Sequence, residues 1–360
     1  MTATDARRDH ALDAARGALM ALGIVIHAAN VYIPAGTWLV ADPARSAFFD
    51  WLASAIHSFR MPAFFWISGY FCALTLERYG TWTFLRKRLP RIAVPLLVSW
   101  GTLNVIQVII IARLSGQDVR SALLSGVPIY HLWFLVDLLV YFSLAALLNC
   151  RVAQPIHWLS KRVLTVANPV LQLMLLAVFA TGLELGVRAT GLAYVNLMGL
   201  TSPFRLVGNF AFFFVGMLMY GSAAMRGSFF RIHPGLLVPA VLLCLWFDRL
   251  VNTESRLLGE LAGLAATLMT WITVAAVIGL FRRLFAQAGR ATRFMSDASY
   301  TIYLFHHVIV VLIAILLLAV PWSAYVKFPI VVLATFGLTA AIHRYCISPS
   351  DLLRFAFNGK

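Results

Sequence analysis

Arg16 and His27 are separated by ten residues in the first long apolar segment of the chain, and their side chains suit different chemistry. A guanidinium binds anions such as phosphate, whereas an imidazole can take a proton near neutral pH. Eleven steps along an α-helix cover about 16 Å and three turns, so both side chains would lie on nearly the same face. An ionisable group inside a bilayer is unfavourable, by about 2.5–3.5 kcal/mol for Arg, and is therefore rarely accidental. The spacing predicts a site that reaches across a membrane, with Arg16 near one surface and His27 deeper.

His57 and Arg60 form a second polar pair, three residues apart and therefore on one helix face. Their segment would run in the direction opposite to that of His27, and the pair would lie in its outer half. His27 reaches a similar depth at about 1.5 Å per residue, so we expect the three side chains to meet. An Arg beside two His residues in a membrane indicates a cavity. The alternative is that Arg60 reaches the interface or pairs with a buried carbonyl, and so holds the helices together.

A basic cluster precedes the third apolar segment and consists of Arg86, Lys87, Arg88 and Arg91. Such clusters are ordinary cytoplasmic flanks of membrane helices and bind lipid headgroups. The functional interpretation is a phosphate-binding rim, because the guanidinium fork matches phosphate oxygens. Pro90 suits the first turn of a helix, whose free N–H groups also favour anions. Both interpretations place the cluster at a membrane surface.

Two later segments carry further ionisable groups. His131 opens the fourth, and Asp137 lies about one and a half turns deeper, where an unpaired carboxylate is costly, so we expect it to have a His or Arg partner. The ninth contains Tyr303 and the adjacent residues His306 and His307. Neighbouring side chains of a helix point in different directions, so we expect at most one of these two histidines to face any given site. Adjacent positions on a regular helix do not chelate, so we expect no metal there.

Apolar segments long enough to hold these residues recur along the whole chain. The 360 residues are 61% hydrophobic and 12% charged, with a mean hydropathy of +0.84, whereas soluble domains have about 25% charged residues. The runs are too long and too uniformly apolar for barrel strands, so we expect an all-α polytopic membrane protein. We expect one transmembrane domain over residues 1–360, without a separate soluble domain. About ten spans are predicted, at 12–34, 50–76, 90–112, 131–149, 170–188, 205–222, 234–251, 259–281, 298–320 and 326–346.

The formal net charge of +15 points to a membrane orientation rather than to a nucleic-acid partner. No basic surface with interleaved aromatic residues is apparent, so nucleic acid is not expected. Lys and Arg residues gather on the segments that are cytoplasmic if both termini are inside, which is the positive-inside pattern. The first segment carries His27 and Asn30 and lacks a small-residue cleavage site, so it does not resemble a signal peptide. The four cysteines lack CxxC spacing, which predicts neither a disulfide nor a metal site.

These motifs together resemble the membrane-bound acyltransferase 3 family over nearly the whole chain. The matching stretches are Arg16-x10-His27, Arg88-x-x-Arg91, His131-Leu-Trp-Phe-Leu135 and Ser299-Tyr-Thr-Ile-Tyr-Leu-Phe-His-His307. The stretch His57-Ser-Phe-Arg60-Met61 is similar to the subgroup that succinylates osmoregulated periplasmic glucans. One departure is Leu138, where many members carry Glu, and we do not treat the neighbouring Asp137 as its equivalent.

The resemblance implies a multi-pass enzyme of the bacterial inner membrane that transfers a succinyl group from cytoplasmic succinyl-CoA to hydroxyls of periplasmic glucans. His27 would act as the general base. The residues expected to bind acyl-CoA are Arg16, Arg86, Lys87, Arg88 and Arg91. Those expected to orient the acyl group or the acceptor, or to stabilise the oxyanion, are His57, Arg60, His131, Asp137, Tyr303, His306 and His307. Acyl-CoA would be a donor substrate, and neither a permanently bound cofactor nor a metal is expected.

The residues leave several alternatives open. The acyl group could be acetyl, and the acceptor another envelope glycan or a lipid-linked sugar. His27 could be acylated first instead of acting as a base. Buried Arg and His residues among many spans also occur in secondary transporters, although we find no inverted repeat. The oligomeric state is not readable from the sequence.

Overall fold

The computed structural model describes residues 9–162, 168–251, 253, 255–285, 287 and 289–359, with the side chains of 150–162 and 291 left aside. Within these ranges the chain is helical and contains no strand, so the all-α prediction is confirmed. The long helices are α1 (His10–Asn30), α2 (Ala47–Arg88), α6 (Trp133–Arg162), α7 (Pro169–Ala189), α8 (Pro203–Gly221), α11 (Arg256–Leu284), α12 (Arg290–Leu317) and α13 (Ala324–Ala341). The shorter ones are α3 (Pro90–Ser99), α4 (Val105–Leu114), α5 (Val119–Leu124), α9 (Ala223–Phe229), α10 (Leu237–Leu250) and α14 (Asp351–Asn358).

Several helices begin where a short polar side chain can accept a hydrogen bond from their first turn. Asp9 accepts from the backbone N–H of Leu12, and Ser46 accepts from that of Phe48. Ser202 caps α8 in the same way, with a proline in the first turn. Such a cap satisfies an N–H group that has no partner inside the helix. Most predicted spans begin within three residues of an observed helix, whereas α12 begins at Arg290, eight residues before the predicted start at 298.

Eight helical stretches of the described residues are long and apolar enough to cross a bilayer, or nine if one bent pair forms a single span. The bent pair is Ala223–Phe229 with Pro234–Leu250, at an angle of 59°. The predicted count of ten is therefore not confirmed. One of the eight is the continuous stretch Ala47–Leu114, which takes in two of the predicted spans. Its 68 residues would extend far beyond a hydrocarbon core of about 30 Å if they were straight.

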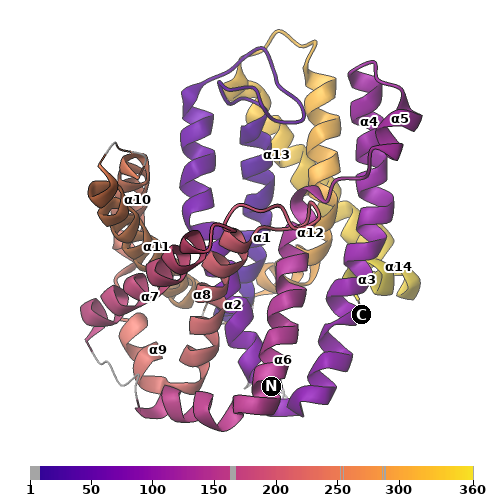
Figure 1. Cartoon of the computed structure of the whole chain (residues 1–360). Helices are drawn as coiled ribbons and strands as arrows, with labels where there is room; N and C mark the ends of the chain where they lie inside the picture. The colour runs from indigo at the N-terminus through magenta and orange to yellow at the C-terminus, as the bar shows by residue number, and fades with distance from the viewer. Residues whose placement is uncertain are drawn as a thin grey trace.

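The stretch is not straight, because α2 changes direction at Gly80. This glycine has φ 71° and ψ 167°, a conformation that a residue with a Cβ rarely adopts. Beyond it, the Arg88 guanidinium donates to Thr75 Oγ1 at 2.8 Å. Thirteen residues of straight helix would separate these positions by about 20 Å, so the segment after Gly80 folds back on α2. Figure 1 shows α3 and α4 then running up beside α6.

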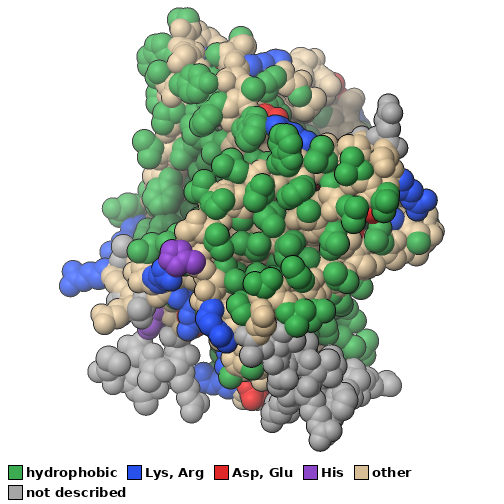
Figure 2. Space-filling model, turned by 90° about the vertical axis from the view of Figure 1, so that its left-hand side faces the viewer, with side chains coloured by type: hydrophobic (Ala, Val, Ile, Leu, Met, Phe, Trp, Pro, Cys, Tyr) green, Lys and Arg blue, Asp and Glu red, His purple; other side chains and the backbone are tan. Residues whose placement is uncertain are grey.

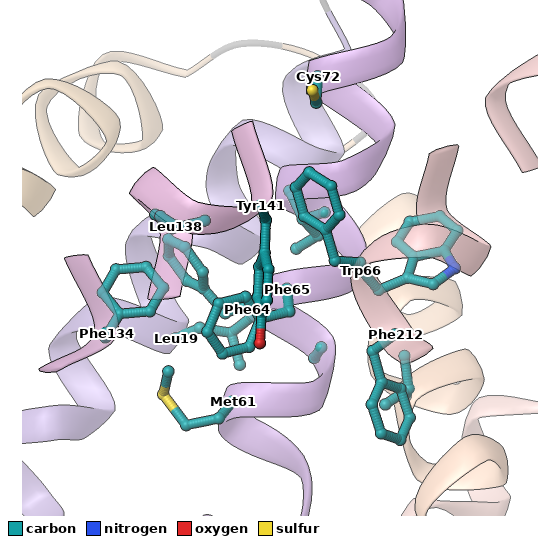
Figure 3. Packing of buried hydrophobic residues seen from close by; sticks show 14 of the residues in the cluster. Leu19, Met61, Phe64, Phe65, Trp66, Cys72, Phe134, Leu138, Tyr141 and Phe212 are labelled. Carbon is teal, nitrogen blue, oxygen red and sulfur yellow. The ribbon is translucent and has the colours of Figure 1, made fainter. Parts of the chain in front are cut away.

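Close helix packing around α2 and α8 depends on two glycines. A Cβ on Gly69 would stand 1.9 Å from the carbonyl oxygen of Phe213, and one on Gly216 would stand 2.1 Å from that of Trp66. Small residues at such contacts let membrane helices approach closely. The main core lies beside this contact, and Figure 3 shows Phe134 of α6 in one cluster with Met61 and Phe64 of α2.

Polar contacts divide between two ends of the bundle. Asp9 pairs with Arg282 at 3.2 Å at the end where Arg16 lies, and Asp42 pairs with Lys327 at 2.7 Å at the other. Figure 2 shows a broad hydrophobic surface on one face of the molecule. The prediction that both termini face the cytoplasm stays a prediction. Among the residues that support it, Arg7, Arg8 and Lys360 lie outside the described residues, and the side chains of Arg151, Lys161 and Arg162 are not described.

Candidate functional site

Three other histidines, from two further parts of the chain, surround His27. Its ring centroid lies 4.6 Å from that of His307, 5.2 Å from that of His306 and 6.4 Å from that of His131. The expectation that at most one of the adjacent histidines faces a given site is therefore wrong. Their rings are nearly perpendicular, at 88°, and approach the His27 ring from two sides because α1 packs directly against α12. Divergent side chains can thus converge on a group that lies between them.

Hydrogen bonds fix the two α12 histidines but not His27. His306 Nδ1 donates to the carbonyl oxygen of Tyr303 at 2.6 Å, and His307 Nδ1 donates to Gln107 Oε1 at 2.7 Å. Both acceptors lack protons, so each Nδ1 carries the hydrogen and each neutral ring keeps its lone pair on Nε2. Within the described part of the chain, four buried histidine ring nitrogens have no hydrogen-bond partner: His27 Nδ1, both nitrogens of His131, and His306 Nε2. Buried polar atoms are almost always paired, so this cluster points to a place where a ligand supplies the missing contacts.

A cavity of about 650 Å³ opens beside this cluster, and we call it the histidine cavity. The predicted site residues that line it are His27, His57, Arg60, His131 and Tyr303. The structure thus brings together the three side chains that the sequence placed at a similar depth, His27, His57 and Arg60, and adds His131 and Tyr303 from two other segments. Asp50, Glu184, Arg188 and Asp248 also line it and were not predicted as site residues. Its volume is typical of a small-molecule pocket.

Arg60 is buried at the wall of the histidine cavity, with 7% of its surface exposed. Its Nε donates to the carbonyl oxygen of Leu19 at 2.9 Å, so the alternative of a bond to a buried carbonyl is correct for one N–H group. The guanidinium still lines the cavity and has further N–H groups to offer. Gly23 makes room for it, because a Cβ there would stand 2.8 Å from Arg60 Nη2 and 3.2 Å from His306 Nε2.

Trp38 covers the histidine cluster from the loop that follows α1. Its ring stacks with His27 at 6.0 Å and meets His307 edge-on at 5.6 Å. The loop is held by Asp42, which is fully buried and pairs with the equally buried Lys327 of α13 at 2.7 Å. Asp42 and Lys327 are 285 positions apart in the sequence. No local sequence pattern could therefore predict that this pair holds the loop with Trp38 beside the site.

A second cavity of about 170 Å³, the arginine cavity, lies nearer the end of α1 where Arg16 is found. Arg16, Arg88 and Arg91 line it, and Asn358 reaches it from α14. Arg16 also pairs with Asp13 at 3.2 Å. The fold-back at Gly80 and the return of α14 therefore gather three predicted acyl-CoA residues. The other two, Arg86 and Lys87, do not line it, and the Lys87 ammonium lies 4.6 Å from the centroid of the Tyr79 ring.

Phe134 separates the two cavities and lines both. Its ring packs edge-on against Phe64 at 4.6 Å and against Tyr303 at 5.6 Å. The Tyr303 hydroxyl donates to the carbonyl oxygen of His131 at 2.6 Å, which fixes this side of the partition. The arrangement places an anion-binding rim and a histidine cluster on either side of a thin aromatic wall.

Asp137 lies outside the linings of both cavities and has the basic partner that was predicted. Its carboxylate lies 3.7 Å from Arg205 Nε and accepts a hydrogen bond from Thr201 at 2.9 Å. Arg205 in turn stacks over the ring of Trp133 at 4.4 Å, and Trp133 lines the histidine cavity. Asp137 therefore contacts the site only through two other side chains.

No group of three or more His, Cys, Asp or Glu side chains in the described ranges is arranged to hold a metal ion. Cys72, Cys244 and Cys346 are free thiols.

Comparison with known proteins gives a consistent result over the whole chain. The family described as acyltransferase domain matches residues 9–344. Glucans biosynthesis protein C from Escherichia coli O81 (strain ED1a) is 26% identical over 385 residues, which cover 100% of this chain and 97% of the relative. The proteins of the same name from strain 536 / UPEC and strain K12 have the same identity and coverage. No solved structure matches.

Proposed function

Because the chain belongs to the acyltransferase family, we propose that it moves a succinyl group from succinyl-CoA, on the cytoplasmic side, to hydroxyls of osmoregulated periplasmic glucans. One observation carries the proposal: His27 faces a ligand-sized cavity that meets an arginine-lined cavity at a single aromatic wall. The full-length similarity to proteins named glucans biosynthesis protein C supports the choice of acceptor.

The arginine cavity would hold the anionic nucleotide end of the donor. Arg16, Arg88 and Arg91 supply three guanidinium groups, which form charge-assisted and often bidentate bonds with phosphate. At about 170 Å³ the cavity is too small for a whole CoA molecule, so it would hold only part of the donor. The pantetheine arm would then pass Phe134 and bring the thioester into the histidine cavity.

His27 would act as the general base once donor and acceptor meet. The glucan hydroxyl oxygen attacks the thioester carbonyl carbon while the imidazole takes the hydroxyl proton. The carbon–sulfur bond of the tetrahedral intermediate then breaks. The imidazolium gives its proton to the CoA thiolate as it leaves. Arg60, whose guanidinium keeps N–H groups to donate, would stabilise the oxyanion. A succinyl ester of the glucan and free CoA are the products.

Arg60 is our candidate for succinyl recognition. Its guanidinium lies buried at the cavity wall, where a bidentate contact with a free carboxylate would be strong. An acetyl group has no such carboxylate, so this contact would favour a dicarboxylic donor. Acetyl transfer to another envelope glycan is the alternative function, and Arg60 would then have no donor carboxylate to bind.

The test uses the purified protein in proteoliposomes with succinyl-CoA and periplasmic glucan. We expect release of free CoA that depends on glucan, together with glucan whose mass has increased by succinyl groups. His27→Ala should lower the rate by about 10²–10⁴-fold, the usual contribution of a general base. Near-normal transfer by this variant would refute the mechanism, and a mass increase by acetyl alone would refute the donor. Uptake of glucan without CoA release would indicate transport.

A further inference from the structure

The two cavities differ in charge. The arginine cavity has three guanidinium groups and one carboxylate, that of Asp297. The histidine cavity has three carboxylates, Asp50 of α2, Glu184 of α7 and Asp248 of α10. Among the described residues these three form neither a hydrogen bond nor an ion pair, so their oxygens are available to a ligand. They lie on three different helices, so they line one cavity only in the folded protein.

Each arginine of the same cavity is partly engaged by other groups, and Arg188 also attracts the Glu184 carboxylate. Arg188 lies 3.8 Å from Glu260 and stacks over the Phe204 ring at 5.0 Å. Arg60 donates to the Leu19 carbonyl at 2.9 Å. Within the described ranges, the carboxylates on α2, α7 and α10 thus give the cavity hydrogen-bond acceptors that no donor occupies.

A second feature shows that the cavity is built for a polar ligand. His131 lines it, is 7% exposed, and finds no hydrogen-bond partner for either ring nitrogen among the described residues. Two aromatic rings, those of Trp133 and Phe204, line the cavity as well. Unpaired acceptors beside flat apolar rings suit a molecule that offers many hydroxyl donors and also apolar C–H faces.

We propose that Asp50, Glu184 and Asp248 form the acceptor subsite, and that it selects an uncharged polyhydroxyl chain over an anionic one. This inference rests on the proposed function, since it assigns the acceptor side of the same reaction. Carboxylate oxygens accept strong hydrogen bonds from sugar hydroxyls. The same charges repel acceptors that carry carboxylate or phosphate groups, so selectivity arises from repulsion as well as attraction. The volume of about 650 Å³ admits a short segment of such a chain.

The test measures binding without any donor, so that it does not depend on turnover. The probes are a neutral β-glucan oligosaccharide and the same oligosaccharide oxidised to a terminal carboxylate. The proteins are the parent, the triple variant Asp50→Asn/Glu184→Gln/Asp248→Asn, and the control Asp118→Asn. Asp118 is an exposed carboxylate that caps α5 outside the cavity, and Asn caps a helix as well as Asp does.

The parent and Asp118→Asn should bind the neutral probe at least tenfold more tightly than the oxidised one. The triple variant should lose about tenfold or more in affinity for the neutral probe and most of the discrimination between the two. Equal binding of the neutral probe by parent and triple variant, or no binding by the parent, overturns the inference. Glucan-dependent CoA release is measured separately, and its absence in a parent that binds the neutral probe counts against the transfer reaction and not against the subsite. Size-exclusion profiles show that each variant is folded.

Discussion

At the scale of single residues, the site depends on which ring nitrogens are already occupied. The Nδ1 atoms of His306 and His307 each donate a hydrogen bond to a fixed acceptor, whereas His27 Nδ1 has no partner within the described ranges. A base that takes a proton from a substrate must keep a nitrogen available where that substrate binds. His306 Nε2 also lacks a partner, but among these three histidines only His27 lines the histidine cavity. Sequence reasoning could identify the histidines, because ionisable groups in apolar spans are conspicuous. It could not assign this difference, because the partners come from backbone carbonyls and from Gln107 of α4.

Gly23→Ala tests the position of Arg60 without removing it. The new Cβ would stand 2.8 Å from Arg60 Nη2, the far end of a flexible side chain, so the guanidinium should move while the protein still folds. We expect succinyl transfer to fall by about tenfold or more, because small displacements at a site are costly to rate. Transfer of acetyl, where that donor is accepted, should fall less. Gly337→Ala, which faces open space, is the control. Equal loss with both donors would argue against a carboxylate contact at Arg60.

At the scale of elements, the helices were predictable and their junctions were not. Hydropathy predicted a span at 326–346, and the structure has α13 and its continuation at Ala324–Ile347. Glu184 lies within the span predicted at 170–188 and was not predicted as a site residue, yet it lines the histidine cavity from α7. The fold-back at Gly80 and the loop that carries Trp38 depend on contacts between distant segments. Periodicity and composition report on neighbours along the chain and are silent on such contacts.

The loop over the histidine cluster should depend on the buried pair of Asp42 and Lys327. Lys327→Met leaves the Asp42 carboxylate buried without a counter-charge, and we expect a loss of about 3–5 kcal/mol in stability. The double variant Asp42→Asn/Lys327→Met removes both charges, and the introduced amide keeps an oxygen for the Ala44 N–H, so this variant should recover much of the loss. Thermal unfolding in nanodiscs measures both. A Lys327→Met protein as stable as the parent would show that the pair does not hold the loop.

At the scale of the whole molecule, the bundle holds two chemically different cavities, one on each side of Phe134. The cationic one lies toward the end where Arg16 is found, and the one with three carboxylates lies beyond Phe134. A thioester that crosses this wall is exposed to water unless the acceptor already fills the far side. Exclusion of water from a site suppresses hydrolysis of reactive groups. We therefore expect the aromatic wall to couple consumption of the donor to transfer to the acceptor.

Phe134→Ala should join the cavities and uncouple the reaction. Loss of the ring removes its packing against Phe64 and Tyr303 and opens a path for water to the thioester. We expect release of CoA without glucan to rise by about tenfold, while the share of succinyl groups that reach glucan falls. Phe142→Ala is the matched control, because Phe142 lies on the same helix and lines only the arginine cavity. Both rates come from one assay of free CoA with and without glucan. If Phe134→Ala released no more CoA than Phe142→Ala in the absence of glucan, the aromatic wall would not be what keeps water from the thioester.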